Sequence, residues 1–251
     1  MAHRSHTEAP NFNPVLWWST VVGICAIIAC GSIFVTLSYL KKRKFEIEHP
    51  RPAYLAKLPD FTATNRDGGE VSFSQLEGDI WVAGYQYTGC PGGCLGMAGI
   101  MKNLYDKFGD RDDFHLVSIS LDPKEDTPAK MDAWVKRNGI DVENWWFLTG
   151  NEERIREYMI RNFKFFGVVE NTDPEEIARS GKFSHDQRLA LVDGAGHVRG
   201  MYDVMNTTQP GMAAASFEQL VSDICYLFEE SGKPLPAGAG DPYADAPDTD
   251  S

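Results

Sequence analysis

The chain reads Ile80-Trp-Val-Ala-Gly-Tyr-Gln-Tyr87 and then Thr88-Gly-Cys-Pro-Gly-Gly-Cys94. The first part is an almost unbroken apolar run rich in aromatic and β-branched residues, which predicts a mostly buried strand. Glycine and proline in the second part predict a turn. Apolar residues continue at helical spacing from Leu95 to Phe108, so a helix is expected to follow. This stretch therefore predicts a strand, a turn with two cysteines, and a helix.

The segments on either side of this unit repeat the alternation of strand and helix. Central strands are expected at 114–121 and 145–148, helices from Thr127-Pro128, at 151–163 and at 217–228, and hairpins at 61–73 and 189–202. The polar stretch 167–184 shows no periodicity and is expected to be a long irregular loop. A hairpin near each end of an alternating chain predicts an α/β protein with a thioredoxin-like fold, in which helices surround a mixed sheet.

The two cysteines of the turn, Cys90 and Cys94, carry the chemistry that the sequence predicts. Their four-residue offset places both sulfurs around one turn at a helix N-terminus, where the partial positive charge is expected to lower a thiol pKa. With the imidazole of His185 they form a soft set of three ligands, which suits Cu(I) and can also hold Cu(II). The same sulfurs can instead close a disulfide. At this point both chemistries stay open.

The other candidate residues have simpler interpretations. Cys25 and Cys30 lie in an apolar run, and Cys225 lies in a helical apolar pattern that predicts burial. Met97 and Met101 follow the cysteines at helical spacing and are expected in the core, although thioether sulfur can assist Cu(I). Surface or structural roles are expected for His115 and His197.

An uncharged apolar segment near the N-terminus predicts membrane attachment. No charged residue occurs from Val15 to Leu40, which is long enough for a tilted transmembrane helix and longer than the core of a cleavable signal peptide. Cys30 closes a sequence similar to a lipoprotein cleavage site, but the apolar run continues past it, which favours an uncleaved anchor in the lipid bilayer. The basic cluster 41–44 follows the span, and by the positive-inside rule it favours a cytoplasmic domain.

The remaining organisation follows from composition. We expect an N-terminal segment at 1–14, the transmembrane helix at 15–40, a charged tether at 41–58, the globular domain at 59–230 and a disordered acidic tail at 231–251. The formal net charge is −12 and the pI is about 4.9. Nucleic-acid binding requires a basic face, so this balance argues against it.

Four pieces of the sequence resemble the Sco/SenC family of copper-binding, thioredoxin-fold membrane proteins. They are Thr88–Cys94, Ser118–Pro128, Phe147–Gly150, and the His185 segment ahead of Leu191-Val-Asp-Gly194, within a resemblance that covers roughly Leu58 to Phe228. The chain departs from the family pattern in having Leu95 after the second cysteine and Asp186 after the histidine. The resemblance implies copper ligation by Cys90, Cys94 and His185, with Asp122 near the metal.

The resemblance also implies a role and a location. The family delivers copper to the binuclear copper centre of cytochrome c oxidase or helps assemble it, which is a metallochaperone role without turnover. The partner would be the oxidase subunit that holds this centre, or another copper or thiol protein. The domain would then lie on the periplasmic side of the membrane or in the mitochondrial intermembrane space, against the positive-inside rule. The alternative is a thiol–disulfide oxidoreductase that uses Cys90 and Cys94 as its catalytic redox pair. Peroxide reduction is less favoured, because no polar helper residues accompany a single activated cysteine.

Overall fold

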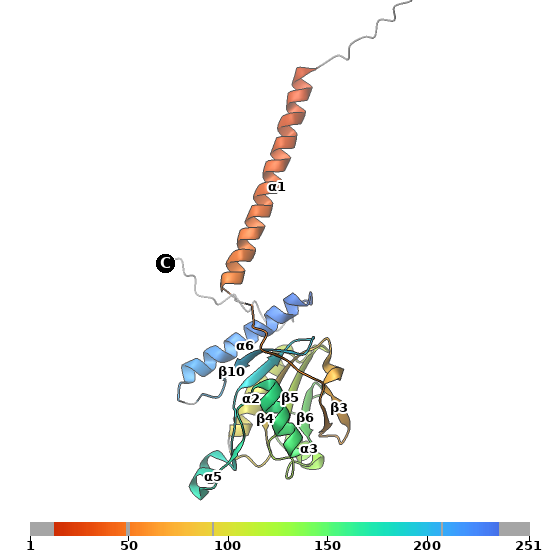
Figure 1. Cartoon of the computed structure of the whole chain (residues 1–251). Helices are drawn as coiled ribbons and strands as arrows, with labels where there is room; N and C mark the ends of the chain where they lie inside the picture. Colours follow the sequence, from red (N-terminus) through yellow and green to blue (C-terminus); the bar gives the residue numbers. More distant parts are fainter. Residues whose placement is uncertain (1–12, 49–50, 92, 207, 236–251) are drawn as a thin grey trace, which may run out of the picture. The chain divides into compact units, whose positions relative to one another are not determined.

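The computed structural model describes residues 13–48, 51–91, 93–206 and 208–235. The chain divides into two compact units, residues 1–50 and residues 51–251 (Figure 1). The first unit contains the helix α1, Pro14–Glu48. Its segment Pro14–Leu40 is long and apolar enough to cross a membrane, as the sequence predicts.

The second unit is built on an eight-stranded mixed sheet with the order β1-β10-β9-β4-β5-β6-β2-β3. Strands β4, β5 and β6 are parallel, and the other pairings in this sheet are antiparallel. The strands are β1 (Ala56–Lys57), β2 (Thr62–Asn65), β3 (Glu70–Ser72), β4 (Ile80–Gln86), β5 (Phe114–Ser120), β6 (Trp145–Thr149), β9 (Leu189–Val192) and β10 (His197–Tyr202). The predicted central strands and both hairpins are confirmed.

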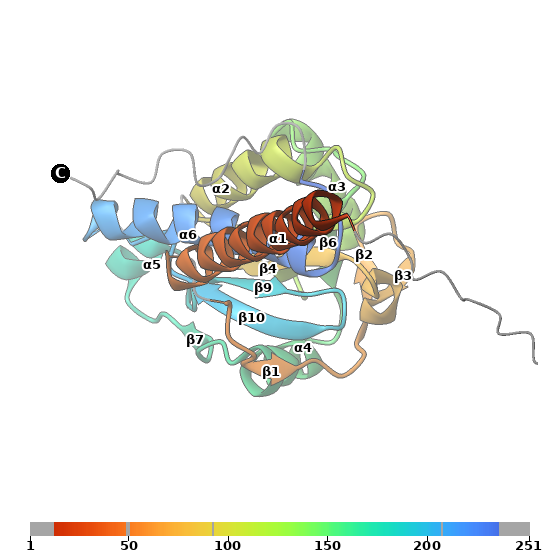
Figure 2. The same ribbon diagram turned by 90° about the horizontal axis from the view of Figure 1, so that it is seen from above.

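Helices cover both faces of this sheet (Figure 2). Along β4, Ile80 and Val82 face a core that includes side chains of α2, α3 and α6, whereas Trp81 and Tyr85 face a core that includes side chains of α4. Every residue of β4 is buried because its alternating side chains enter cores on opposite sides. The helices are α2 (Gly93–Phe108), α3 (Pro128–Arg137), α4 (Glu152–Tyr158) and α6 (Pro210–Glu230), with a 3₁₀ turn η1 (Phe73–Leu76) and a π-helical turn η2 (Met159–Phe163).

Two predictions about local structure need correction. The segment 167–184 is not an irregular loop, because it contains β7 (Val169–Glu170), the helix α5 (Pro174–Ser180) and β8 (Phe183–Ser184), with β7 and β8 paired antiparallel. Asp173 caps α5 by accepting a hydrogen bond from the Glu175 N–H, and Pro174 occupies the first helical position. Helix α5 projects from the edge of the compact unit (Figure 1).

The predicted tether also differs from the structure. Helix α1 continues to Glu48, so the first part of 41–58 is helical, and the second compact unit begins at Arg51 rather than Pro59. The last helix of the unit, α6, ends at Glu230. The N-terminal segment up to residue 12 and the acidic tail from residue 236 lie outside the described residues.

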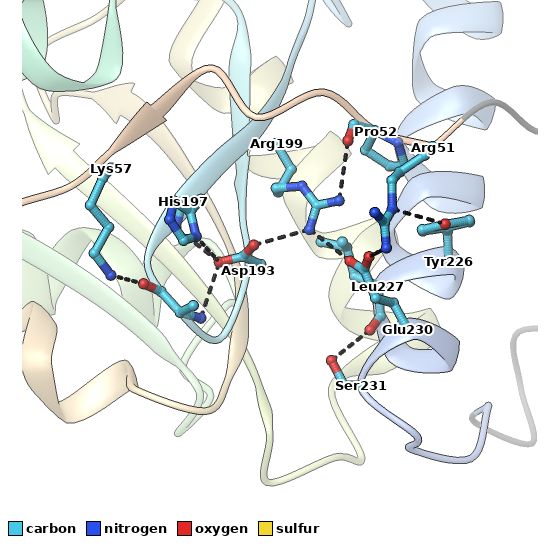
Figure 3. A network of polar contacts seen from close by, with 11 residues as sticks. Arg51, Pro52, Lys57, Asp193, His197, Arg199, Tyr226, Leu227, Glu230 and Ser231 are labelled. Carbon is cyan, nitrogen blue, oxygen red and sulfur yellow. Dashed lines mark hydrogen bonds and ion pairs between the residues drawn. The ribbon is translucent and has the colours of Figure 1, made fainter.

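A buried guanidinium fixes the beginning of the second unit to its last helix (Figure 3). The Arg199 side chain on β10 is 1% exposed and forms ion pairs with Asp193 at 3.0 Å and Glu230 at 2.7 Å. It also donates a hydrogen bond to the Pro52 carbonyl at 3.1 Å. Arg51 pairs with the same Glu230. The segment after residue 50 is therefore part of the folded unit, because a buried charge needs these partners.

Candidate metal centre

Cys90 and Cys94 lie where β4 gives way to α2, as the sequence predicts. Cys94 is in the first turn of α2, and its N–H donates a hydrogen bond to the Cys90 sulfur at 3.2 Å. The two sulfurs are not joined in a disulfide. Cys94 is 4% exposed, whereas Cys90 is half-buried. A partner molecule can therefore reach the Cys90 sulfur before the Cys94 sulfur.

The predicted lowering of a thiol pKa at this helix N-terminus is wrong for Cys94. The pKa of Cys94 is raised well above its ordinary value, first by its hydrogen bond with the Cys90 thiol and then by burial. A hydrogen bond from the Tyr87 backbone acts in the opposite direction but is weaker. Cys94 is therefore a thiol at neutral pH, because its hydrogen bond with the Cys90 thiol and the burial of its side chain both disfavour the thiolate.

His185 follows β8 directly and is half-buried beside the cysteine loop. Its ring meets the rings of Tyr85 and Tyr87 edge to face, at centroid distances of 6.1 and 6.3 Å. Its Nδ1 lies 2.7 Å from the Asp186 carbonyl oxygen. A carbonyl can only accept, so Nδ1 carries the proton and the Nε2 lone pair is left for a ligand.

The electrostatics of His185 also suit ligation. Burial lowers its pKa, although the carbonyl of Asp186 and the neighbouring Cys90 act in the opposite direction. The imidazole is therefore neutral at neutral pH, which is the form that binds metal. Within the described residues, no three His, Cys, Asp or Glu side chains lie close enough together to hold a metal ion as they stand. Ligation by Cys90, Cys94 and His185 remains a prediction.

Asp122, predicted near the metal, lies just beyond the end of β5 and is 6% exposed. Lys182 donates a hydrogen bond to its carboxylate at 3.4 Å. Lys182 immediately precedes β8, so this contact links the end of β5 to the segment that carries His185. The role of Asp122 near a metal is not tested by these contacts and stays a prediction.

Asp126 is a neighbour of the cysteine loop that the sequence analysis did not single out. It is 1% exposed and accepts hydrogen bonds from the Thr88 N–H at 3.1 Å, the Thr88 hydroxyl at 2.5 Å and the Ser120 hydroxyl at 2.7 Å. Its charge also contributes to the raised pKa of Cys94. The carboxylate thus holds the loop two residues before Cys90.

The structure agrees with the interpretations of the two methionines, of Cys225 and of the other two histidines. Met97, Met101 and Cys225 are buried in the core on the α2 and α6 side of the sheet. His115 lies 3.2 Å from the Asp79 carboxylate, and His197 lies 3.3 Å from Asp193. Both histidines therefore have structural partners away from the cysteine loop.

A thioredoxin-like sheet with a cysteine pair at the start of the helix after a central strand defines the class of protein. The chain belongs to the SCO1/SenC family, whose family model matches residues 52–222. It is 28% identical over 170 residues to the SCO1 protein homolog of Bacillus subtilis. The aligned region covers 67% of this chain and 81% of that protein. The resemblance noted in the sequence is thereby confirmed.

Solved structures agree with this assignment. The chain is similar to a SCO1/SenC family lipoprotein from Bacillus anthracis, with a TM-score of 0.56 and 28% identity, over 68% of this chain and 95% of that one. It is also similar to BsSco, which is described as a member of the Sco family of cytochrome c oxidase assembly proteins. A disulfide switch is described in BsSco. That match has a TM-score of 0.52 and 25% identity, and covers 66% of this chain and 96% of the other.

Proposed function

We propose that this chain is a membrane-anchored copper-binding protein that delivers copper to the binuclear copper centre of cytochrome c oxidase, or assists its assembly. One observation carries the proposal: a cysteine pair at the start of α2 lies beside a neutral imidazole whose Nδ1 is fixed by a carbonyl. Two sulfurs and one imidazole nitrogen are soft donors that suit Cu(I) and can also hold Cu(II). The described function of BsSco in oxidase assembly supports the same role.

The proposed cargo is copper, held by Cys90, Cys94 and the Nε2 atom of His185. The Asp186 carbonyl fixes the ring tautomer, as partners of ligating histidines commonly do. Copper binding would release the thiol protons, so the raised pKa of Cys94 makes loading depend on pH. Because Cys90 is the more exposed sulfur, a partner's ligand would reach the metal from the Cys90 side.

The membrane location rests on α1. Its apolar segment Pro14–Leu40 would cross the bilayer, and the sheet domain would lie on the periplasmic side or in the mitochondrial intermembrane space. A dithiol that alternates with a disulfide is more useful where the surroundings are not strongly reducing. The basic cluster after the span favours the opposite orientation, but this rule is statistical.

A second function is supported by the unequal exposure of the two cysteines. A half-buried Cys90 beside a buried Cys94 thiol is an arrangement in which one sulfur attacks a partner disulfide and the other resolves the mixed disulfide. The disulfide switch described for BsSco supports this alternative. The chain would then be a thiol–disulfide oxidoreductase that reduces cysteines on a partner.

Copper titration of the full chain in detergent micelles tests the two functions. We expect about one tightly bound copper ion per chain, lost in Cys90→Ala and Cys94→Ala. His185→Ala should weaken binding and change the absorption spectrum without unfolding the domain. His197→Ala is the matched control, because that ring pairs with Asp193 instead. If the reduced protein binds no copper, and the oxidised protein exchanges its Cys90–Cys94 disulfide readily with a model thiol, the oxidoreductase function is correct.

A further inference from the structure

The carboxylate of Asp186 is buried directly after His185 and is surrounded by hydrogen-bond donors. Asp186 is 3% exposed. One carboxylate oxygen accepts hydrogen bonds from the backbone N–H and the Nε of Arg188, both at 2.9 Å. The other oxygen accepts from the Phe166 N–H at 2.8 Å and from a terminal guanidinium nitrogen of Arg188 at 2.6 Å. A carboxylate offers about four acceptor sites, so these four bonds hold it in a single orientation.

The turn that follows η2 supplies part of this arrangement. Lys164 in that turn has a φ of +64°, in the left-handed region, which is uncommon for a residue with a side chain. The Lys164 carbonyl accepts a hydrogen bond from Arg188 at 3.3 Å, and the Phe166 N–H is one of the donors to Asp186. The Arg188 guanidinium also lies over the Phe166 ring, 4.4 Å from its centroid. A costly backbone conformation that brings these groups to one ion pair points to a role for that pair.

Asp186 also contacts the ring of His185 through its backbone. The Asp186 carbonyl oxygen lies 2.7 Å from Nδ1 of that ring, whereas the Asp186 side chain is tied to the turn after η2. Because the carboxylate cannot turn without breaking its bonds, the backbone that carries this carbonyl is held as well. The ring also meets Tyr85, which packs against Phe165 of the same turn at a centroid distance of 5.2 Å. The carbonyl and aromatic contacts of His185 therefore both lead back to one turn.

We propose that Asp186 and Arg188 are positioning residues for His185: their ion pair fixes the Asp186 carbonyl, which keeps the ring proton on Nδ1 and leaves Nε2 free for a ligand. An imidazole without such a contact favours the proton on Nε2, where it would block ligation at that atom. The inference rests on the proposed use of His185 as a copper ligand. Asp186 is one of the positions at which this chain departs from the family pattern, so the arrangement is not part of that pattern.

The test measures the tautomer of His185 by NMR, in the full chain labelled with ¹⁵N at histidine and held in detergent micelles without copper. At about pH 8 an ordinary imidazole is neutral, and the chemical shifts of its two nitrogens report which one carries the proton. His185→Gln assigns the signals. The unmodified chain should carry the proton on Nδ1. Asp186→Asn should move most of the population to Nε2, because an amide group turns N–H groups toward donors that need an acceptor.

Asp193→Asn is the matched control. The Asp193 carboxylate accepts hydrogen bonds from the backbone N–H groups of Ala195 and His197 at 3.0 and 2.9 Å, and it pairs with Arg199 at 3.0 Å. It therefore has the same kind of donors as Asp186, but in the hairpin of β9 and β10. Its replacement should lower the melting temperature and leave the tautomer of His185 unchanged. Equal tautomer changes in the two variants would overturn the proposal.

Arg188→Gln covers the case in which Asp186→Asn does not fold, because it keeps both backbone donors to Asp186. It should move the tautomer in the same direction by a smaller amount, and Arg188→Lys should restore part of the change.

Copper titration of the same samples is the second measurement. Copper affinity should fall about tenfold or more in Asp186→Asn and stay unchanged in Asp193→Asn. If the unmodified chain binds no copper, the proposed function fails, but the tautomer still decides this inference. A proton on Nε2 in the unmodified chain would overturn it. So would an unchanged tautomer in folded Asp186→Asn, or in Arg188→Gln where Asp186→Asn does not fold.

Discussion

Thr88 donates both its backbone N–H and its hydroxyl to the carboxylate of Asp126, at 3.1 and 2.5 Å. Thr88 belongs to the loop after β4, and Asp126 belongs to the connection between β5 and α3. The contact therefore joins the carboxyl ends of two neighbouring parallel strands. Cys90 follows Thr88 by two residues, so the position of its sulfur depends on this anchor.

We predict that Asp126→Asn destabilises the domain and weakens copper binding. The amide that replaces the carboxylate would turn N–H groups toward Thr88 and Ser120, which both donate hydrogen bonds to the carboxylate of Asp126. A buried donor left without an acceptor costs roughly 1–3 kcal/mol of folding stability. Thermal unfolding and copper titration measure the two effects. Asp122→Asn is the control for stability, because the described hydrogen-bond partner of that carboxylate is the partly exposed Lys182 at 3.4 Å. The prediction fails if the two variants lose equal stability, or if Asp126→Asn keeps full copper affinity.

Gly181→Ala is expected to displace the turn between α5 and β8 from Tyr87. Both the positive φ and the overlap with the hydroxyl disfavour a side chain, with a cost on the order of 1–3 kcal/mol. Gly78→Ala separates the two causes, because Gly78 has the same φ of +94° but has no atom within 4 Å of an added Cβ. Denaturant unfolding should show the larger loss for Gly181→Ala, and Tyr87→Phe should partly restore it. Equal losses at the two glycines would show that the contact has no effect.

Cys225→Ser should lower stability without changing copper binding. The thiol is 0% exposed in the core between the sheet and α6, where a hydroxyl without a partner costs roughly 1–3 kcal/mol. For a domain of this size the melting temperature should fall by about 2–4 °C for each kcal/mol. Calorimetry and copper titration on the same sample check this. A variant with normal melting but lost copper would place Cys225 at the metal.

The proposed orientation predicts protease sensitivity. Protease added to intact spheroplasts, or to mitoplasts, should digest the sheet domain while α1 stays protected by the bilayer. Digestion that requires opening the membrane would reverse the orientation. That outcome would also argue against copper delivery, because the domain could not meet its proposed partner.

The central fold was predictable because its middle strands are long and almost entirely buried. β4 and β5 each contain seven residues with apolar side chains on both faces. Such a short, nearly continuous apolar run is typical of a central strand that is covered on both sides. The segment 167–184 was not predictable in the same way. Helix α5 buries none of its residues, so it has no apolar periodicity, and β7 and β8 contain two residues each. Its cap, Asp173-Pro174, was the available signal.

The candidate site was predictable only in part, for a related reason. Cys90 and Cys94 are close in sequence, and the family resemblance identified His185. Asp126 became visible only in the fold, because its donors Thr88 and Ser120 come from the loop after β4 and from β5. The raised pKa of Cys94 likewise depends on its hydrogen bond with the Cys90 thiol and on burial of its side chain, which an argument from the helix terminus alone does not include.

The ion pairs of Arg199 have a mechanical consequence. Val198 pairs with Val192, which pairs with Trp81 at the beginning of β4, whereas the cysteines follow the other end of that strand. Tension on the chain at Arg51 would first load Glu230 and the Pro52 carbonyl. The seven residues of β4, a length of about 20 Å, separate the Trp81 end of that strand from the cysteine loop. Movement of the proposed membrane anchor would therefore be absorbed at one end of the sheet, while the geometry of the sulfurs is kept at the other.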